Sequence, residues 1–432
     1  MRRAGWVIGL CLAALVLGLA GAWAGEQAAG STPTIAALLA EALARSQELY
    51  ALQERVVAAE AMIRPAGALP DPMAQVGYQN IPVGAGLALD QDMMSSFMLM
   101  LSQQLPPASR RRLMSEAQGA EVVMARAQLA DKRNDIVRKV KQAYIDVQYR
   151  DEALAIAERN RDVAKDMLET AEARYATGKV MQQDVFQAQV QLSRMLDMVV
   201  MQRRERTMAV TRLNRLLYRD PAAEMGGLPR LQRTQANLEG LSARVEEANP
   251  QLAEMRARVA QAERSQGVAT SMIKPELILS FSYMIRKPLE ANPMTGDDMW
   301  TALVGINLPW VYRRDKVDEE VRAATAERGA AERDVEAMRN ELVSMAEEMV
   351  IDIGRAEEQL ALVETGLLPQ AEGAYAASRA SYATGMGDVL SLLDNQMNLY
   401  NLELQRAMLL RDRERAVADV EYLVGGALLA GR

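Results

Sequence analysis

The sequence contains no histidine, and its only cysteine, Cys11, lies in an apolar stretch near the N-terminus. After residue 24 the chain therefore lacks imidazole bases, thiol nucleophiles and strong zinc ligands. Paired carboxylates are the only catalytic groups left, so we expect no enzyme, no cofactor and no metal site. Aromatic residues make up only 4% of the chain, whereas Ala, Leu, Met, Arg and Glu are abundant, which is typical of long packed helices.

The first 24 residues have the layout of a cleavable secretory signal peptide. Arg2 and Arg3 precede an apolar run over residues 6–20, and Ala22-Trp23-Ala24 offers a small-residue cleavage site before Gly25. Without residues 1–24, 48 basic and 57 acidic residues leave a net charge of −9, and no basic tract points to nucleic acid. No second apolar run of about 18 residues follows, so we expect no membrane-spanning helix.

The tetrapeptide Tyr-Ala-Thr-Gly occurs twice, at residues 175–178 and 382–385, an offset of 207 residues. Each copy lies between two helical patterns, so its glycine stands where a helix stops in a left-handed cap. A single copy would be an ordinary helical-hairpin turn, but two copies in register favour a duplicated architecture. The sequence predicts two structural repeats, residues 25–232 with a turn near 178 and residues 233–432 with a turn near 385.

Each repeat also contains two segments in which apolar and polar residues alternate, as in a strand with one face in water. We expect strands at about 73–83 and 93–105, and at about 276–286 and 299–309, paired as hairpins with long loops. A soluble four-stranded sheet is one reading. The other is an outer-membrane barrel completed by further protomers, because four strands cannot close alone. The residues then expected to face lipid are Leu279, Phe281, Tyr283, Val304 and Ile306.

A long heptad-spaced pattern follows each hairpin. From Pro107 to Thr177 it covers about 70 residues, which as a helix would be about 105 Å long. Such a length suits a tube across the periplasm. Methionine is frequent, and Met338, Met345 and Met349 lie on the second seam, where packing is favoured over binding of a soft metal. On the strands, alternation places Met98 and Met100 on the polar face.

These features together resemble the TolC-like outer-membrane efflux channels. The resemblance rests on the duplicated order of helix, hairpin, long helix, turn and returning helix, and on the Tyr-x-x-Gly turn followed by Asp184-Val185 and Gln189. Leu105-Pro106 and Leu308-Pro309-Trp310 look closest to the heavy-metal efflux branch. The resemblance implies a mostly α fold with a small β part, in which three chains form a 12-stranded outer-membrane β-barrel on a periplasmic α-helical barrel.

The same resemblance implies a passive exit duct in the outer membrane of a Gram-negative bacterium, with a long periplasmic portion. It would export metal ions or small toxic molecules. Its partners would be two further copies of the chain, outer-membrane lipid, a periplasmic adaptor and an inner-membrane pump. From the residues alone, a periplasmic coiled-coil adaptor or scaffold is the alternative.

Positions near the turns are expected to form the periplasmic gate. Carried over by position, Asp184 and Tyr382 match residues that tie neighbouring helices together, and Asp394 matches an acidic ring at the constriction. Asp394 could also be an ordinary solvated helix residue, and Asp388 is a further candidate. Gly387 stands where TolC itself has an arginine partner for these contacts.

The turns themselves are the expected surface for the helical tip of the adaptor. The residues assigned to this contact are Gly178, Lys179, Val180, Gly385, Met386 and Gly387. Exposed apolar side chains and free backbone groups are the features that suit such a contact.

Overall fold

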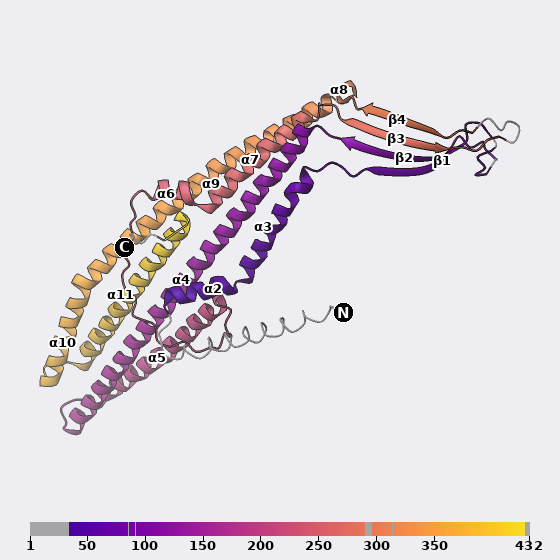
Figure 1. Ribbon diagram of the computed structural model, residues 1–432. Coiled ribbons are helices and arrows are strands. Elements are labelled where there is room, and N and C mark those ends of the chain that lie inside the picture. The colour runs from indigo at the N-terminus through magenta and orange to yellow at the C-terminus, as the bar shows by residue number, and fades with distance from the viewer. Residues whose placement is uncertain (1–33, 85, 91, 290–295, 313, 428–432) are drawn as a thin grey trace, which may run out of the picture.

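The computed structural model describes residues 34–84, 86–90, 92–289, 296–312 and 314–427. The expected signal peptide at residues 1–24 lies outside the described residues. A four-stranded sheet forms one end of the molecule, and the helices run away from it to two helical turns at the opposite end (Figure 1).

The two halves of the chain have the same order of elements. The first half comprises α2 (Ile35–Arg45), α3 (Gln47–Ala66), β1 (Met73–Gln79), β2 (Ser96–Leu105), α4 (Ala108–Ala176) and α5 (Gln182–Leu216). The second half comprises α6 (Leu241–Ala248), α7 (Pro250–Ser271), β3 (Leu277–Ile285), β4 (Met299–Ile306), α8 (Pro309–Tyr312), α9 (Arg314–Leu362), a π-helical segment (Val363–Leu367), α10 (Leu368–Thr384) and α11 (Val389–Val424). The matching start of α3 and α7 has a common cause, because Ser46 and Asn249, 203 residues apart, both cap their helix by accepting a backbone N–H.

The strands form one antiparallel sheet in the order β1-β2-β3-β4, so the two hairpins are joined through β2 and β3. The first strand ends at Gln79 rather than 83, because Asn80 has a left-handed φ of 55° and Pro82 cannot donate to the ladder. The second begins at Ser96 rather than 93, because the preceding residues form a turn in which Met94 N donates to Asp92 Oδ1 at 2.7 Å. The fourth ends at Ile306 rather than 309, since Pro309 already begins α8.

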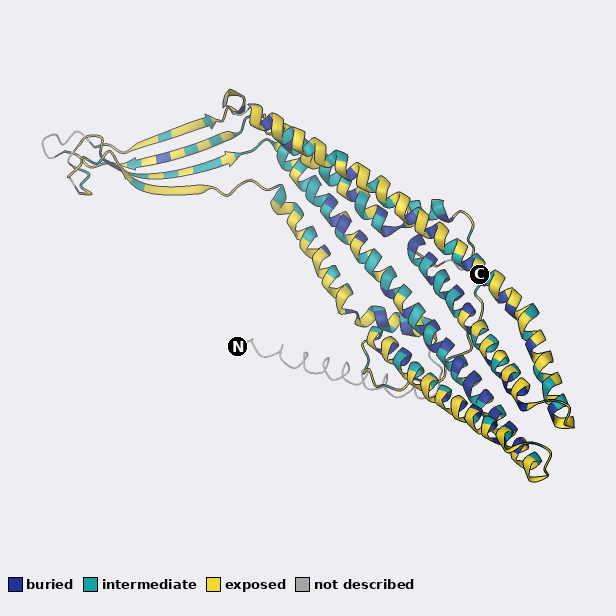
Figure 2. Cartoon of the chain, turned by 180° about the vertical axis from the view of Figure 1, so that it is seen from behind, coloured by how far each residue is buried: buried dark blue, intermediate teal, exposed yellow. Residues whose placement is uncertain are grey.

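The sheet has one apolar and one mixed face. On the apolar face, Phe281 stacks on Trp300 with ring centroids 6.2 Å apart, and Tyr78 meets Phe97 edge to face at 5.2 Å. The five residues expected to face lipid all lie on this face and are all exposed in the single chain: Leu279, Phe281, Tyr283, Val304 and Ile306. The sheet projects beyond the helices, which leave this face uncovered (Figure 2). An apolar surface of this kind is normally covered by lipid or protein.

The expected long helix is present as α4, which has 69 residues. Its heptad positions Val140, Val147, Ala157, Ala164 and Ala171 are buried against the neighbouring helices. Within the described ranges, no helix combines the length and apolar character required to cross a membrane.

Each half of the chain has an apolar core between its helices. The first contains Leu38, Val140 and Leu213, and the second contains Val245, Leu342 and Leu423 among others. Met338 and Met349 pack against the second core as expected. Met345, by contrast, is 40% exposed, because the buried face of α9 passes from Leu342 to Ala346, four residues on, and does not include Met345.

The second long helix differs from α4 in having a wide turn, the π-helical segment Val363–Leu367, between α9 and α10. Pro369 lies just after this segment and cannot donate the hydrogen bond to the residue four before it. The regular ladder is therefore interrupted here, and α10 continues to the second turn.

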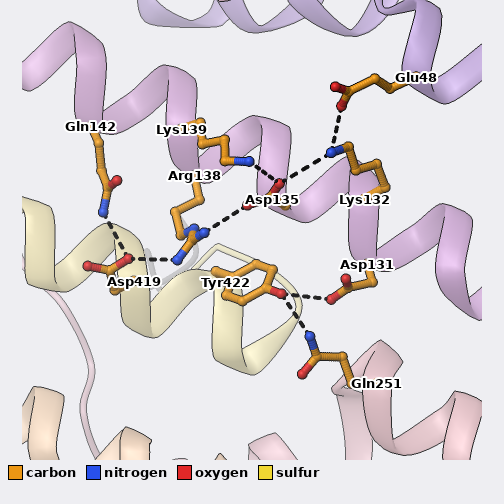
Figure 3. Close-up of polar contacts among 10 residues, drawn as sticks. All are labelled: Glu48, Asp131, Lys132, Asp135, Arg138, Lys139, Gln142, Gln251, Asp419 and Tyr422. Atoms are coloured by element: carbon orange, nitrogen blue, oxygen red, sulfur yellow. Dashed lines mark hydrogen bonds and ion pairs between the residues drawn. The ribbon is translucent and has the colours of Figure 1, made fainter.

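A polar network joins the two halves of the chain along α4 and α11 (Figure 3). Arg138 of α4 donates to Asp135 at 2.8 Å and to Asp419 of α11 at 3.4 Å. Tyr422 of α11 donates to Asp131 of α4 at 2.9 Å and lies under the Arg138 guanidinium, 4.5 Å from ring centroid to Cζ. Burial raises the pKa of the Asp419 carboxyl, and Arg138 offsets only part of this shift. The repeats are thus held together by charged as well as apolar contacts.

Candidate functional site

The two helical turns lie next to each other at the end of the molecule farthest from the sheet (Figure 1). One turn joins α4 to α5, and the other joins α10 to α11. Side chains from both turns meet in one apolar cluster, which contains Val180 from the first turn and Tyr382 from the second. The site therefore consists of two hairpins that contact each other.

The first turn closes around Gly178, whose φ of 68° is left-handed. Gly178 N donates to the carbonyl oxygen of Tyr175 at 2.9 Å, and Lys179 N donates to that of Arg174 at 2.9 Å. Asp184, in the first turn of α5, accepts a hydrogen bond from Met181 N at 3.2 Å. Gly178 and Lys179 are exposed, as expected for a contact surface.

The second turn closes around Gly385, with a φ of 82°. Met386 N and Gly387 N both donate to the carbonyl oxygen of Ser381 at 3.0 Å. Gly387 is needed for this close approach, because a Cβ there would lie 3.0 Å from the Ser381 side chain. Met386 is 83% exposed.

Asp388 caps the start of α11. Its Oδ1 accepts from Ser391 N at 2.8 Å, and its Oδ2 accepts from the Ser391 hydroxyl at 2.8 Å. The backbone hydrogen bond from Ser391, followed by the one from its hydroxyl, lowers the pKa of Asp388. Both Asp388 and Asp184 therefore have local roles at helix N-termini within the chain.

Tyr382 is buried, with 4% of its surface exposed, and packs against Met167, Val389 and Leu392. Val180 packs against the same cluster and is only partly exposed, so its contact with an adaptor stays a prediction. Its exposure is reduced because the Tyr382 cluster of the neighbouring hairpin packs against it. The turn surface left open to a partner is formed by Gly178, Lys179, Gly385 and Met386.

Arg174 is the residue at this site that sequence reasoning missed. Its guanidinium carbon lies 4.7 Å from the centroid of the Tyr382 ring. The side chain crosses from the first hairpin to the second, since a Cβ on Gly385 would lie 3.1 Å from Arg174 Nη2. Arg174 thus supplies an arginine contact to the Tyr382 hairpin, whereas Gly387 offers none. The repeat gave no signal for it, because Ser381 occupies the equivalent position in the second copy.

The hydroxyl of Tyr382 has no hydrogen-bond partner among the described residues, and the same is true of Arg174 Nη1. Burial raises the pKa of the Tyr382 hydroxyl; Arg174 lowers it and Asp184 raises it. No hydrogen bond joins Tyr382 to Asp184 within the described part of this single chain. A contact of Tyr382 Oη with a neighbouring chain stays a prediction.

Asp394 lies on α11 about two turns beyond Asp388 and is exposed. It borders a groove of about 580 Å³ between α5 and α11, together with Phe186, Arg194 and Met397. In the described ranges it forms no ion pair or side-chain hydrogen bond. The structure therefore brings Tyr382, Arg174 and Asp184 together and leaves Asp394 apart, with its charge unpaired.

Comparison with known families gives a match to the outer membrane efflux protein family over residues 38–217 and 241–426, one segment for each half of the chain. No relative was found among curated proteins by sequence comparison. The fold is shared with several solved channels. The outer-membrane channel OprN matches with a TM-score of 0.77 at 20% identity, over 92% of this chain and 91% of OprN.

Two further structures have the same fold. CusC, described as forming a transmembrane channel, matches with a TM-score of 0.76 at 18% identity, over 93% of this chain and 96% of CusC. The outer membrane protein VceC of Vibrio cholerae matches with a TM-score of 0.76 at 18% identity, over 91% of this chain and 96% of VceC. The resemblance drawn from the Tyr-x-x-Gly turns and the duplicated hairpins is confirmed. The chain belongs to the outer membrane efflux protein family, whose members are outer-membrane channels and not enzymes.

Proposed function

We propose that three copies of this chain assemble into a passive exit duct of a tripartite efflux system. The observation that carries this proposal is the sheet, which has one uncovered apolar face and two outer strands, β1 and β4, whose far edges pair with nothing among the described residues. Unpaired strand edges in lipid cost several kcal/mol for each backbone group. Twelve strands from three chains would pair these edges and place the apolar face against lipid.

The duct takes its energy from an inner-membrane pump through a periplasmic adaptor. The two turns support this part of the proposal, because Met386 is 83% exposed and Gly178, Lys179 and Gly385 are open at the same end. An apolar side chain and a flexible cation at the tip of a rigid hairpin suit contact with another helical tip. The cargo we propose is a metal ion or a small toxic molecule.

Asp394 is the proposed constriction residue. It lies about two turns beyond the tip of α11, where helices that converge on a threefold axis bring three copies close together. Asp388 and Asp184 already accept local hydrogen bonds at helix starts, whereas Asp394 has no such partner in the described chain. Three like charges in a narrow aqueous mouth attract cations and repel anions. Tyr382 and Asp184 would hold adjacent hairpins in the closed arrangement.

Planar bilayer recordings test the duct and the ring together. Asp394→Asn should lower cation selectivity and weaken block by multivalent cations, because it removes three charges and keeps the side-chain shape. Glu372→Gln is the control, since it neutralises an exposed acidic residue on α10 away from the turn. A parent protein that forms no pores would refute the duct. Unchanged selectivity and block in Asp394→Asn would place the ring elsewhere, with Asp184 and Asp388 as the next candidates.

A further inference from the structure

All five methionines of the sheet lie on the same face. The register places Met73 opposite Ser102, Met98 opposite Met284, and Met100 opposite Ser282, and paired residues share a face. The remaining methionine, Met299, lies opposite Met284. The other residues of this face are mainly Ser, Gln, Thr and Gly, whereas the opposite face carries Leu, Val, Ile and aromatic side chains.

Three of these methionines form one row across neighbouring strands. Met98 of β2 pairs with Met284 of β3, and Met284 pairs with Met299 of β4. Directly paired residues have Cβ atoms about 4.5 to 5.5 Å apart, so flexible thioether side chains in such a row can turn toward a common point. Gly77 ends the row on β1, and its position is open, which leaves space beside Met98.

Packing does not account for this arrangement. Methionine usually fills gaps in an apolar core, yet the sheet places it on the face that also holds Ser282, Thr301 and Gln75. Met299 is 49% exposed, and Met98 and Met284 are partly exposed, so the row is not buried in a core of this chain. If methionine served here only as an apolar residue, the opposite face would be the place for it.

We infer that the row Met98, Met284 and Met299 is a binding site for a soft monovalent cation such as Cu(I) or Ag(I). Thioether sulfur is a soft, uncharged ligand that selects such ions over Na⁺, Mg²⁺ and Zn²⁺. The inference rests on the proposed duct for the placement of the row, because a barrel with its apolar face in lipid has the methionine face toward the lumen. Sites along a conduction path must bind ions weakly enough to release them, and neutral ligands meet that condition.

Thioethers are also exposed at the other end of the molecule. Met181 and Met386, one beside each helical turn, are 72% and 83% exposed. A soft cation could therefore meet an exposed sulfur ligand, Met181, at the periplasmic end, where Met386 is assigned to the adaptor contact, and again on the inner face of the sheet. On this inference, soft metal ions are the substrate class of the proposed duct.

Titration of the detergent-solubilised full chain with Ag(I) in chloride-free buffer tests the site. Met98, Met284 and Met299 are changed together to Leu, which keeps volume and removes sulfur. The control changes three buried methionines that lie outside the sheet and outside the Tyr382 cluster to Leu in the same way: Met124, Met195 and Met225. We expect the strand variant to bind one Ag(I) fewer per chain than the parent, and the control to bind the same number as the parent.

Potassium conductance in planar bilayers, recorded for the same three proteins, separates this inference from the proposed duct. We expect equal potassium conductance in all three and block by Ag(I) that is weaker only in the strand variant. Equal Ag(I) stoichiometry for the parent and the strand variant would overturn the metal site, even where conductance shows a working pore. If no protein conducts but the strand variant still binds one Ag(I) fewer, the site stands and the duct fails.

Discussion

Arg174 gives the sharpest test of the mouth, because its guanidinium links the first hairpin to the buried Tyr382 of the second. The cation lies 4.7 Å from the ring centroid, inside the range at which such contacts contribute about 0.5 to 1 kcal/mol when exposed and about 2 when desolvated. Arg174 is partly exposed, so we take about 1 kcal/mol for each chain. If only closed hairpins make this contact, its loss raises the ratio of open to closed hairpins about fivefold.

The perturbation is Arg174→Ala, measured as the open fraction and conductance of single channels in planar bilayers. Arg174→Lys should have an intermediate effect, because an ammonium does not stack on a ring as a planar guanidinium does. Arg379→Ala is the matched control, since this arginine of α10 is near the same end of the molecule but exposed. The reasoning fails if Arg174→Ala forms trimers with the parent's open fraction, or if Arg379→Ala opens the channel equally.

Three further predictions follow from other parts of the fold. Phe281→Arg places a charge on the apolar face and should cost about 2 to 4 kcal/mol near the bilayer midplane, whereas Ser280→Arg places it on the opposite face. The yield of membrane-inserted trimer should therefore fall for Phe281→Arg and not for Ser280→Arg. Gly178→Ala and Gly385→Ala should each lower stability by about 1 kcal/mol for a left-handed Ala, but only Gly385→Ala also displaces Arg174 and alters gating in bilayers. Burial holds the folded-state pKa of Asp419 above its unfolded value, so its contribution to stability is full at low pH and is lost as pH rises through the folded pKa. The unfolding temperature of Asp419→Asn should therefore fall less between pH 4 and 7 than that of the parent.

The order of helices, strands and turns could be predicted from the sequence because the signals for it are local and occur twice. Gly178 and Gly385 each adopt the left-handed cap that a helix stop requires, and the alternation placed Leu279, Phe281 and Tyr283 on one face of the third strand, as the register has them. The end of the first strand was missed because one residue, Asn80, leaves the extended region, which alternation alone does not reveal.

Contacts between the two repeats could not be predicted from these local signals. Arg174 and Tyr382 lie more than 200 residues apart, and nothing in either segment marks the other as its partner. The duplication also does not extend to burial, because Tyr175 has the same local sequence as Tyr382 but is 47% exposed, whereas Tyr382 is 4% exposed. Identical local sequence therefore fixed the turn but not the burial of the side chain beside it.

The π-helical segment Val363–Leu367 lies in the longer of the two long helical arms, α4 in the first half and α9 with α10 in the second. The Leu-Pro pairs that precede these arms, at residues 105–106 and 308–309, are 203 residues apart, and the turn glycines are 207 apart, so the second arm is four residues longer. In a regular helix four residues add about 400° of rotation, one full turn and about 40° more, and the wide turn underwinds part of that excess. The two copies of the tetrapeptide thus reach the tip in different rotational phase. In the proposed trimer, the six hairpin tips are of two kinds, three of each, in alternation. A partner that docks there meets two different surfaces built on the same tetrapeptide.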